Sequence, residues 1–300
     1  MTIALRFKNL RAMSRYLYLM PAVILVSLIV IYPIISNIIN SLQTDKRLLM
    51  GVVKPAFVGL SNFINAWKEG LFQVSLKNSL LFTISSVAIA FVLGLIISIL
   101  LNRVKRFRVF YRVLIVVPWV ISPMVAAFSW KFLFNDSFGL INYFLLKIGL
   151  IHEKIVWLGS FKTAFMALTI ANIWRIFPFI TIMLLAGLQS VSKDIEEAAE
   201  IDGAGPVQKY IHILLPQMKH VIIIVILLQF IWNFNEFTVI QTLTQGGPAD
   251  STVVVPVLIH KLGFKYWRAG TASALSLILS IIILTLSLLY LRIVGRKGDD

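Results

Sequence analysis

Apolar residues fall into six long blocks along the chain, and short polar stretches separate them. The blocks occupy residues 17–39, 78–101, 111–134, 163–188, 221–243 and 270–291. A helix needs roughly 20 apolar residues to cross the hydrocarbon core of a bilayer, so each block predicts one transmembrane helix. Prolines inside the blocks are compatible with this interpretation because membrane helices tolerate kinks. The pattern therefore predicts an all-α, multi-pass integral membrane protein with six transmembrane helices.

Lys and Arg cluster on alternate connections between the blocks, and this asymmetry predicts the orientation of the chain. These basic residues are Arg6, Lys8, Arg11, Arg15, Arg103, Lys105, Arg106, Arg108, Arg112, Arg296 and Lys297. Because cytoplasmic loops carry the excess of positive charge, we expect both termini in the cytoplasm. Residues 1–16 are then a cytoplasmic N-terminal arm, and residues 17–300 are a six-helix domain in the cell membrane, inner or plasma. The first block is too long for a signal peptide and is expected to be retained.

Composition supports a bilayer protein and excludes several other classes. The 300 residues are 59% hydrophobic and 14% charged, whereas soluble domains are about 45–50% apolar and about 25% charged. The net charge of +15 sits in short loops as a topology signal, which disfavours a nucleic-acid partner. The chain has no cysteine, and its four histidines lack the spacing of metal ligands, so we expect neither a metal site nor a bound cofactor. Without a Gly-x-x-x-x-Gly-Lys-Ser/Thr loop or a catalytic constellation, we expect no ATP hydrolysis and no enzyme activity by this chain alone.

The connection between the fourth and fifth blocks, residues 189–220, is acidic and needs an explanation beyond topology. Ser192 is suited to cap a helix whose first turn carries acidic residues. Gly203 and Gly205 are suited to end that helix, and Pro206 to begin the next one. The sequence predicts a helix, a glycine turn and a second short helix that runs into the fifth span.

This loop resembles the "EAA" loop of permease subunits in binding-protein-dependent ABC importers. The matching positions are Glu197-Ala198-Ala199, Gly203, Ile213 and Leu215-Pro216, and a departure occurs where a further proline is usual and this chain has His220. In that family the loop is the coupling helix that docks in a groove of the ATPase subunit. The resemblance implies ATPase coupling by Glu197, Ala198, Ala199, Asp202, Gly203, Ala204, Ile213, Leu215 and Pro216.

Other segments extend the resemblance over most of the chain. Residues 57–63 resemble the start of the first external loop in sugar permeases. Residues 134–139, 172–178, 232–237 and 243–248 resemble the larger maltose-type permease subunit, although the length of the chain is more similar to that of the shorter six-helix sugar permeases. The resemblance implies the MetI-like fold of type I ABC importer permeases. It also implies four kinds of partner: a second permease in a heterodimer, two ATPase subunits or an ATPase homodimer, an extracytoplasmic solute-binding protein, and the lipid bilayer. Gly246, Gly247 and Pro248 are unsuited to regular helix and are expected to form an external loop that contacts the binding protein.

Polar residues inside the spans are costly and therefore need a partner or a function. Asn172, Arg175 and Phe179 share one face of the fourth helix, and Gln229, Asn233 and Glu236 share one face of the fifth. Amides and charges suit sugar hydroxyls, and rings stack on the apolar face of a sugar. The expected substrate pathway is Trp119, Asn172, Arg175, Phe179, Gln229, Trp232, Asn233 and Glu236, which matches pathway positions of the maltose-type permease. In the alternative interpretation Arg175 and Glu236 pair to brace the bundle, and the two asparagines hold helices together.

The leading hypothesis is a permease subunit of an ATP-driven importer for a sugar, a di- or oligosaccharide. Arg175 keeps open an anionic solute such as a glycerol phosphate or a sugar acid. An ion-coupled secondary transporter would use the charges of Arg175 and Glu236, but the acidic loop argues against it. A polytopic membrane enzyme is disfavoured because no catalytic constellation is present.

Overall fold

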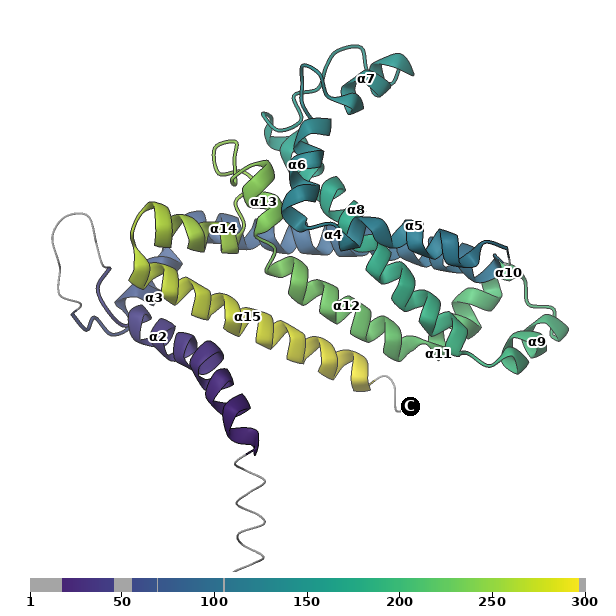
Figure 1. The fold of residues 1–300 in the computed structure, drawn as a ribbon, viewed down its shortest axis with the longest axis horizontal. Helices are drawn as coiled ribbons and strands as arrows, with labels where there is room; N and C mark the ends of the chain where they lie inside the picture. The colour runs from purple at the N-terminus through teal and green to yellow at the C-terminus, as the bar shows by residue number, and fades with distance from the viewer. Residues whose placement is uncertain (1–17, 46–55, 69, 105, 297–300) are drawn as a thin grey trace, which may run out of the picture. The chain divides into compact units, whose positions relative to one another are not determined.

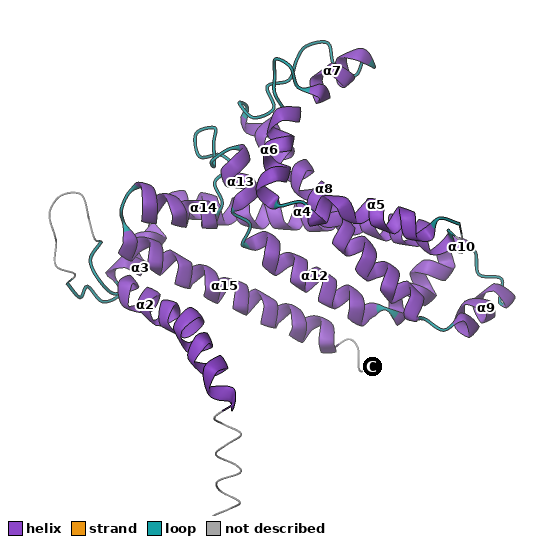
Figure 2. Cartoon of the chain, in the orientation of Figure 1, coloured by secondary structure: helices purple, strands orange, loops and turns teal. Residues whose placement is uncertain are grey.

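The computed structural model describes residues 18–45, 56–68, 70–104 and 106–296, and every regular element within them is helical (Figures 1 and 2). The basic residues of the N-terminal arm, Lys105 and Lys297 lie outside these ranges, so the arm and its boundary at residue 16 stay predictions. A first helix begins at Tyr18 and continues to Ser41. This first helix includes η1 (Ser27–Ile31) and α2 (Tyr32–Ser41). The elements that follow within the described chain are α3 (Ser61–Lys68), α4 (Gly70–Arg103), α5 (Arg108–Val120), α6 (Pro123–Leu133), α7 (Leu140–Lys147), α8 (Phe161–Ser190), α9 (Lys193–Ile201), α10 (Pro206–Gln208), η2 (Lys209–Leu214), α11 (Leu215–Gln217), α12 (Lys219–Phe234), α13 (Thr238–Leu243), α14 (Val255–His260), η3 (Lys261–Lys265) and α15 (Ala269–Arg296).

Four helices of the described chain are long and apolar enough to cross a membrane, and two bent helix pairs raise the number of candidate spans to six. The third expected span is not one continuous helix, because α5 and α6 meet at an angle of 90°. Ile121 and Ser122 have extended ψ angles of 133° and 134°. Pro123 explains this break, since a proline disfavours helical geometry in the residue before it and is suited to begin a helix. Pro118, in contrast, lies inside α5 without ending it.

The fifth expected span also differs from one continuous helix over residues 221–243. The segment α12 ends at Phe234, and α13 begins only at Thr238. The Asn235 side-chain amide donates to the Ile231 carbonyl over 2.9 Å, a bond typical of a helix end because it satisfies a carbonyl that lacks an intrahelical partner. At its other end, α12 is bent by 77° from residues 206–217. The second helix of the hairpin therefore does not run straight into the fifth span.

The described chain divides into two compact units. In the unit formed by Met1–Lys68 and Ile259–Ile278, polar contacts join the end of α2 to the start of α15. Asn62 donates its amide to the carbonyls of Ser41 and Gln43, over 2.8 and 2.7 Å. Asp45 accepts from the Thr271 backbone N–H over 2.8 Å. These contacts satisfy backbone groups where α2 and α15 end and begin.

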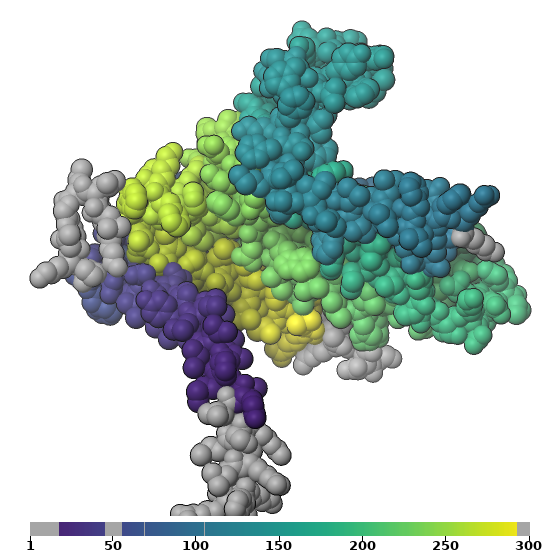
Figure 3. Space-filling view, in the orientation of Figure 1, coloured from purple at the N-terminus to yellow at the C-terminus, as the bar shows by residue number. Residues whose placement is uncertain are grey.

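The second unit, Glu69–Leu258 with Leu279–Asp300, is organised by the packing of α4 on α8. A Cβ at Gly94 would lie 2.9 Å from Ile180 Cγ2 and 3.2 Å from the Thr181 backbone nitrogen, so glycine allows this close approach. α4 also holds residues 251–255, because Asn78 donates to the Ser251 and Val253 carbonyls, each over 2.9 Å. In Figure 3 the segment with α6 and α7 stands out from the rest of this unit.

Candidate functional site

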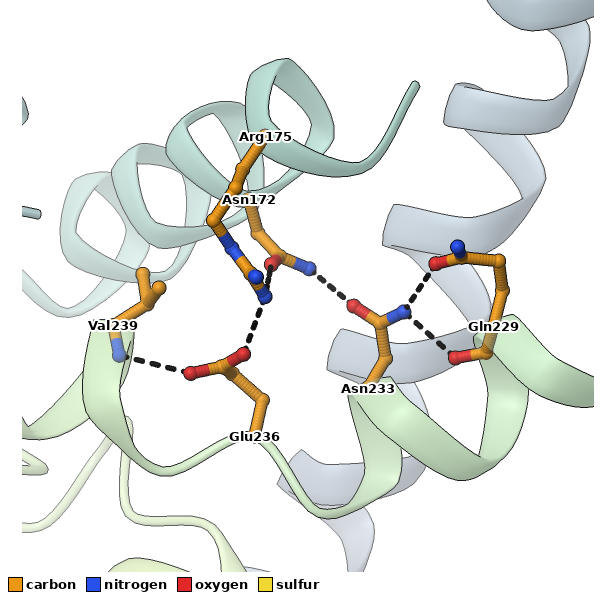
Figure 4. Close-up of polar contacts among 6 residues, drawn as sticks. All are labelled: Asn172, Arg175, Gln229, Asn233, Glu236 and Val239. Carbon is orange, nitrogen blue, oxygen red and sulfur yellow. Dashed lines mark hydrogen bonds and ion pairs between the residues drawn. The ribbon is translucent and has the colours of Figure 1, made fainter. Parts of the chain in front are cut away.

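A network of polar side chains joins α8 to α12 and to the connection that follows α12 (Figure 4). Asn172 donates to the Asn233 amide oxygen over 2.6 Å. Asn233 in turn donates to both the backbone carbonyl and the side-chain oxygen of Gln229, over 2.7 and 3.0 Å. All three side chains are almost fully buried, with exposed fractions of 0% for Asn172, 1% for Gln229 and 3% for Asn233. Buried amides are stable only when hydrogen-bonded, and these three satisfy one another.

Arg175 and Glu236 form an ion pair beside these amides. Arg175 also donates to the Asn172 oxygen over 3.3 Å, so the ion pair and the amides form one network. The other Glu236 oxygen accepts from the Val239 backbone N–H over 3.0 Å. The expectation that Glu236 lies on the same helix face as Asn233 is wrong, because the helix ends at Phe234 and Glu236 lies in the connection to α13.

The position of Glu236 has a physical reason. The first backbone N–H groups of any helix lack intrahelical partners, and a carboxylate at that end satisfies one of them and complements the helix dipole. Glu236 performs this role for α13 through Val239. The spacing of apolar residues continues through the break and therefore does not indicate that a helix ends there. Asn235 followed by a carboxylate was the signal that could have indicated a new helix start.

Three aromatic rings lie in a row next to this network. The ring centroids of Trp119 on α5 and Phe179 on α8 are 5.5 Å apart, and those of Phe179 and Trp232 on α12 are 5.1 Å apart. Trp119 and Trp232 remain 46% and 47% exposed, so their faces are available to another molecule. The structure thus places all eight expected pathway residues on α5, α8, α12 and the connection between α12 and α13. Their role in the passage of a solute stays a prediction.

The acidic hairpin has the helix-and-turn geometry that its sequence predicts. Ser192 accepts from the Asp194 backbone N–H over 3.3 Å and caps α9. Gly203 has a positive φ of 78°, which a residue with a side chain adopts at a cost. Across this turn the Ala204 N–H donates to the Ala199 carbonyl over 3.0 Å, as in a glycine-terminated helix. Pro206 begins α10.

A lysine that sequence reasoning did not select joins the two arms of the hairpin. Lys209 in η2 contacts the carboxylates of Glu200 and Glu196 on α9, over 2.7 and 3.3 Å. The hydrogen bond with Glu200 raises the pKa of Lys209. Burial of the ammonium group opposes this shift but does not cancel it. The same hydrogen bond lowers the pKa of Glu200. The two arms are therefore joined by charge near the turn.

The residues expected to contact an ATPase differ in their exposure. Glu197, Ala198, Asp202, Gly203 and Pro216 are exposed, Ala204, Ile213 and Leu215 are half-buried, and Ala199 is buried. Near the turn, Ile201 and Val207 present apolar side chains that are 85% and 70% exposed. These two residues were missed, although a large apolar side chain in a charged loop is itself a signal for a contact surface.

The second arm of the hairpin is anchored in the core of its unit. Tyr210, Leu214 and Met218 belong to one buried cluster with Ile180 and Leu188 of α8. Their four-residue spacing places them on one helical face. The hairpin therefore packs directly against α8, which also carries Asn172 and Arg175.

The segment Gly246-Gly247-Pro248 forms an ordered loop, as expected from its composition. Gly246 has a φ of 84°, and the peptide bond between Gly247 and Pro248 is cis. Thr244 and Thr252 hold the loop: the Gly247 N–H donates to the Thr244 carbonyl over 2.9 Å, and the Thr252 hydroxyl donates to the Gly247 carbonyl over 2.6 Å. Its contact with a binding protein stays a prediction.

Apolar helices of membrane-spanning length, a polar network buried between two of them and an acidic helical hairpin define a membrane-embedded permease. Residues 90–297 match the family described as "Binding-protein-dependent transport system inner membrane component", and the chain belongs to this family. The family that the EAA loop indicates is thereby confirmed.

Relatives of known name align over nearly the whole chain. The chain is 32% identical over 298 residues to the trehalose/maltose transport system permease protein MalF of Thermococcus litoralis, which covers 98% of each protein. It is 30% identical over 283 residues to the sn-glycerol-3-phosphate transport system permease protein UgpA of Yersinia pestis, covering 94% of each. It is also 29% identical over 281 residues to the sulfoquinovosyl glycerol transport system permease protein SmoG of Agrobacterium fabrum, covering 94% of this chain and 90% of the relative.

A solved structure confirms the expected fold. A chain of a bacterial ABC transporter involved in the import of the acidic polysaccharide alginate superposes with a TM-score of 0.83 at 22% identity, covering 97% of this chain and 98% of the other. The importer-permease fold that the sequence predicts is therefore present.

Proposed function

We propose that this chain is one of two permease subunits of an ATP-driven importer and that it moves a sugar across the cell membrane. The observation that carries the proposal is the row of Trp119, Phe179 and Trp232, whose two tryptophans are partly exposed, beside the amides of α8 and α12. Amides exchange hydrogen bonds readily with hydroxyl groups, and partly exposed rings offer flat apolar surfaces. The names of the trehalose/maltose and sulfoquinovosyl glycerol permeases support a carbohydrate solute.

The Arg175–Glu236 pair disfavours the alternative of an anionic solute. Arg175 is the cation that an anion would need, and its charge is already neutralised by Glu236. An anion would have to displace a carboxylate that also holds the start of α13. Because one relative is named for the transport of sn-glycerol 3-phosphate, this anion serves as the comparison solute in the uptake experiment below.

In the proposed assembly, ATP hydrolysis resides in separate ATPase subunits, and both termini lie in the cytoplasm. The exposed face of α9 docks on an ATPase, while Gly246, Gly247 and Pro248 contact a solute-binding protein outside. What supports this arrangement is the exposed apolar tip of the hairpin at Ile201 together with the buried anchor at Leu214. Such a hairpin connects the surface proposed to contact the ATPase with the helices that carry the polar network.

Uptake by the reconstituted complete transporter tests the function. We expect uptake of a labelled disaccharide that requires ATP and the binding protein, and no uptake of glycerol 3-phosphate. Asn233→Ala should impair uptake by an extent that differs between two sugars, because only some sugars place a hydroxyl at that position. Uptake that an uncoupler abolishes and ATP does not affect would refute the importer assignment.

A labelling experiment tests the orientation separately. The chain contains no cysteine, so a single Ile201→Cys substitution reports on which side of the membrane the exposed tip of the hairpin lies. A membrane-impermeant thiol reagent should label this cysteine in inverted vesicles and not in intact cells. Labelling in intact cells would place the hairpin outside and contradict the docking of α9 on an ATPase.

A further inference from the structure

A groove of about 350 Å³ lies between the end of α4 and the start of α5, within the second unit. Its walls are apolar: Ile97 and Leu100 come from α4, and Tyr111 and Ile115 come from α5. Where the chain turns between the two helices, the groove is lined by Arg106 and Phe107. The groove therefore has an apolar length and one cationic end.

Two further arginines, Arg108 and Arg112, lie in the first turns of α5 close to this end in sequence, although they are not among the residues that line the groove. Arg108 and Arg112 lie one turn apart on α5, and in the favoured orientation of the Gln189 amide both donate to its oxygen, Arg112 over 2.7 Å. The Nε atoms of both arginines are buried and have no hydrogen-bond partner. Within the part of the chain that the structure describes, no carboxylate forms an ion pair with either of them or with Arg106.

The start of α5 adds to this positive potential. Phe107 precedes the helix with a left-handed φ of 60°, no side chain caps the first backbone N–H groups, and no acidic residue lies in the first turn. Uncapped N–H groups at a helix start carry partial positive charge and favour an anion. The arginines and the helix start thus act in the same direction, toward a negatively charged ligand.

The location of the groove relative to the hairpin determines which side of the membrane it faces. Arg103 at the end of α4 lies over the Tyr210 ring of the hairpin, 5.5 Å from its centroid, and the α4–α5 turn lies at the same end of this unit as α9 and α10 (Figure 1). With the hairpin in the cytoplasm, as the proposed function requires, the groove opens into the cytoplasmic leaflet. Anionic phospholipids of that leaflet attract basic residues at the membrane surface.

We propose that this groove binds an anionic phospholipid. One acyl chain lies along the apolar wall formed by Leu100, Tyr111 and Ile115, and the phosphate lies at Arg106 and the start of α5. Charge complementarity selects this occupant, because a zwitterionic lipid would bring its own cationic group toward the arginines. The positive-inside distribution explains why basic residues lie on this side of the membrane, but not why Arg106 lines the end of an apolar groove.

Lipid retention by the complete transporter tests the proposal. The complex is purified from vesicles of equal phosphatidylglycerol and phosphatidylcholine, and the retained lipids are counted by native mass spectrometry. We expect preferential retention of phosphatidylglycerol. Arg106→Gln should reduce this preference about fivefold, since an arginine near a lipid surface contributes about 1 kcal/mol. The matched control Arg292→Gln removes one exposed arginine from the end of α15 and should leave the preference unchanged.

A second variant and a competitor identify the source of the phosphate. Leu100→Trp fills the groove without changing charge, and Leu100 is 57% exposed, so the fold should tolerate it. This variant should lose the bound lipid, and inorganic phosphate should not displace phosphatidylglycerol from the wild type. Displacement by inorganic phosphate together with unchanged retention in Leu100→Trp would show a phosphate site and overturn the lipid assignment.

Three further results would overturn the proposal. They are equal retention of the two lipids, equal losses in Arg106→Gln and Arg292→Gln, and cross-linking of a photoreactive phenylalanine analogue at position 111 to a protein subunit instead of to lipid. Uptake and ATP hydrolysis are measured on the same preparation. Lipid preference without transport would contradict the proposed function alone, and transport without lipid preference would contradict the lipid site alone.

Discussion

The Arg175–Glu236 pair allows a sharp test of whether the polar network braces the helices or contacts solute. Only 17% of the Arg175 side chain and 10% of the Glu236 side chain are exposed. Replacing Glu236 by Gln keeps an oxygen that accepts from the Val239 N–H but removes the charge. Arg175 is then left as an uncompensated cation, which costs about 3–5 kcal/mol for a buried pair. That corresponds to a factor of roughly 10² to 10⁴ in the ratio of folded to unfolded protein.

The double variant Arg175→Met with Glu236→Gln removes both charges and retains side-chain length at both positions. Because a neutral pair avoids the cost of burying charge, its stability should return to the wild-type value or above. The measurements are yield and thermal unfolding of the purified complex for the wild type, both single variants and the double variant. Glu153→Gln, at an exposed carboxylate in the connection between α7 and α8, is the control for the loss of any one acid.

Uptake measured on the same four proteins separates the two interpretations. If the pair only braces α8 against α13, the double variant should transport every solute at nearly the wild-type rate. If the pair contacts solute, the double variant should be stable but impaired, and by different factors for two sugars. Destabilisation of the double variant by the sum of the two single-variant effects would refute the reasoning, because the two substitutions would then not be coupled.

Three further predictions concern the hairpin and the external loop. Gly203→Val should uncouple ATP hydrolysis from uptake while Gly203→Asn retains coupling, because valine resists the φ of 78° that asparagine tolerates; the rates of hydrolysis and uptake check this. Leu214→Ala should cost about 2–5 kcal/mol in thermal unfolding because the side chain is 0% exposed, whereas Ile211→Ala, at 52% exposure, should leave stability unchanged. Gly246→Val should weaken the stimulation of ATP hydrolysis by loaded binding protein without changing the basal rate, and a parallel fall of both rates would assign the loop a purely structural role.

The apolar blocks and the capping residues were sufficient to predict the first, second, fourth and sixth spans and the hairpin turn. The length of an apolar block is enough to locate a span. Ser192, Gly203 and Pro206 favour a helix cap, a positive φ and a helix start by their own chemistry, without any tertiary contact. The break at Ser122 was not predicted, because a proline in an apolar block is compatible either with a kinked helix or with a new helix start. The direction in which α6 continues is not a local property, because α6 packs on α13, which is far away in sequence.

The residues of the candidate site were predicted from the sequence, but their contacts with one another were not. The polar residues of α8 and α12 were identifiable because each is costly in a membrane. Their pairing was left open, since spacing along one helix does not determine the partner on another. Tyr210 and Met218 could not be recognised as core residues, because their burial arises from α8 and lies beyond the local pattern. Glu236 was placed on the wrong element because the spacing of apolar residues continues through the break between α12 and α13.

The two neighbouring alanines of α9 should differ in which substitutions they tolerate. Ala198 is exposed on the surface proposed to meet an ATPase, whereas Ala199 is buried within the hairpin. A bulky residue at position 198 leaves the permease fold intact, so a second-site change in the ATPase could restore growth on the transported solute. A bulky residue at position 199 damages the hairpin itself, and suppressors should arise only within this chain. A genetic screen for suppressors should therefore return two separate classes of mutation from adjacent codons.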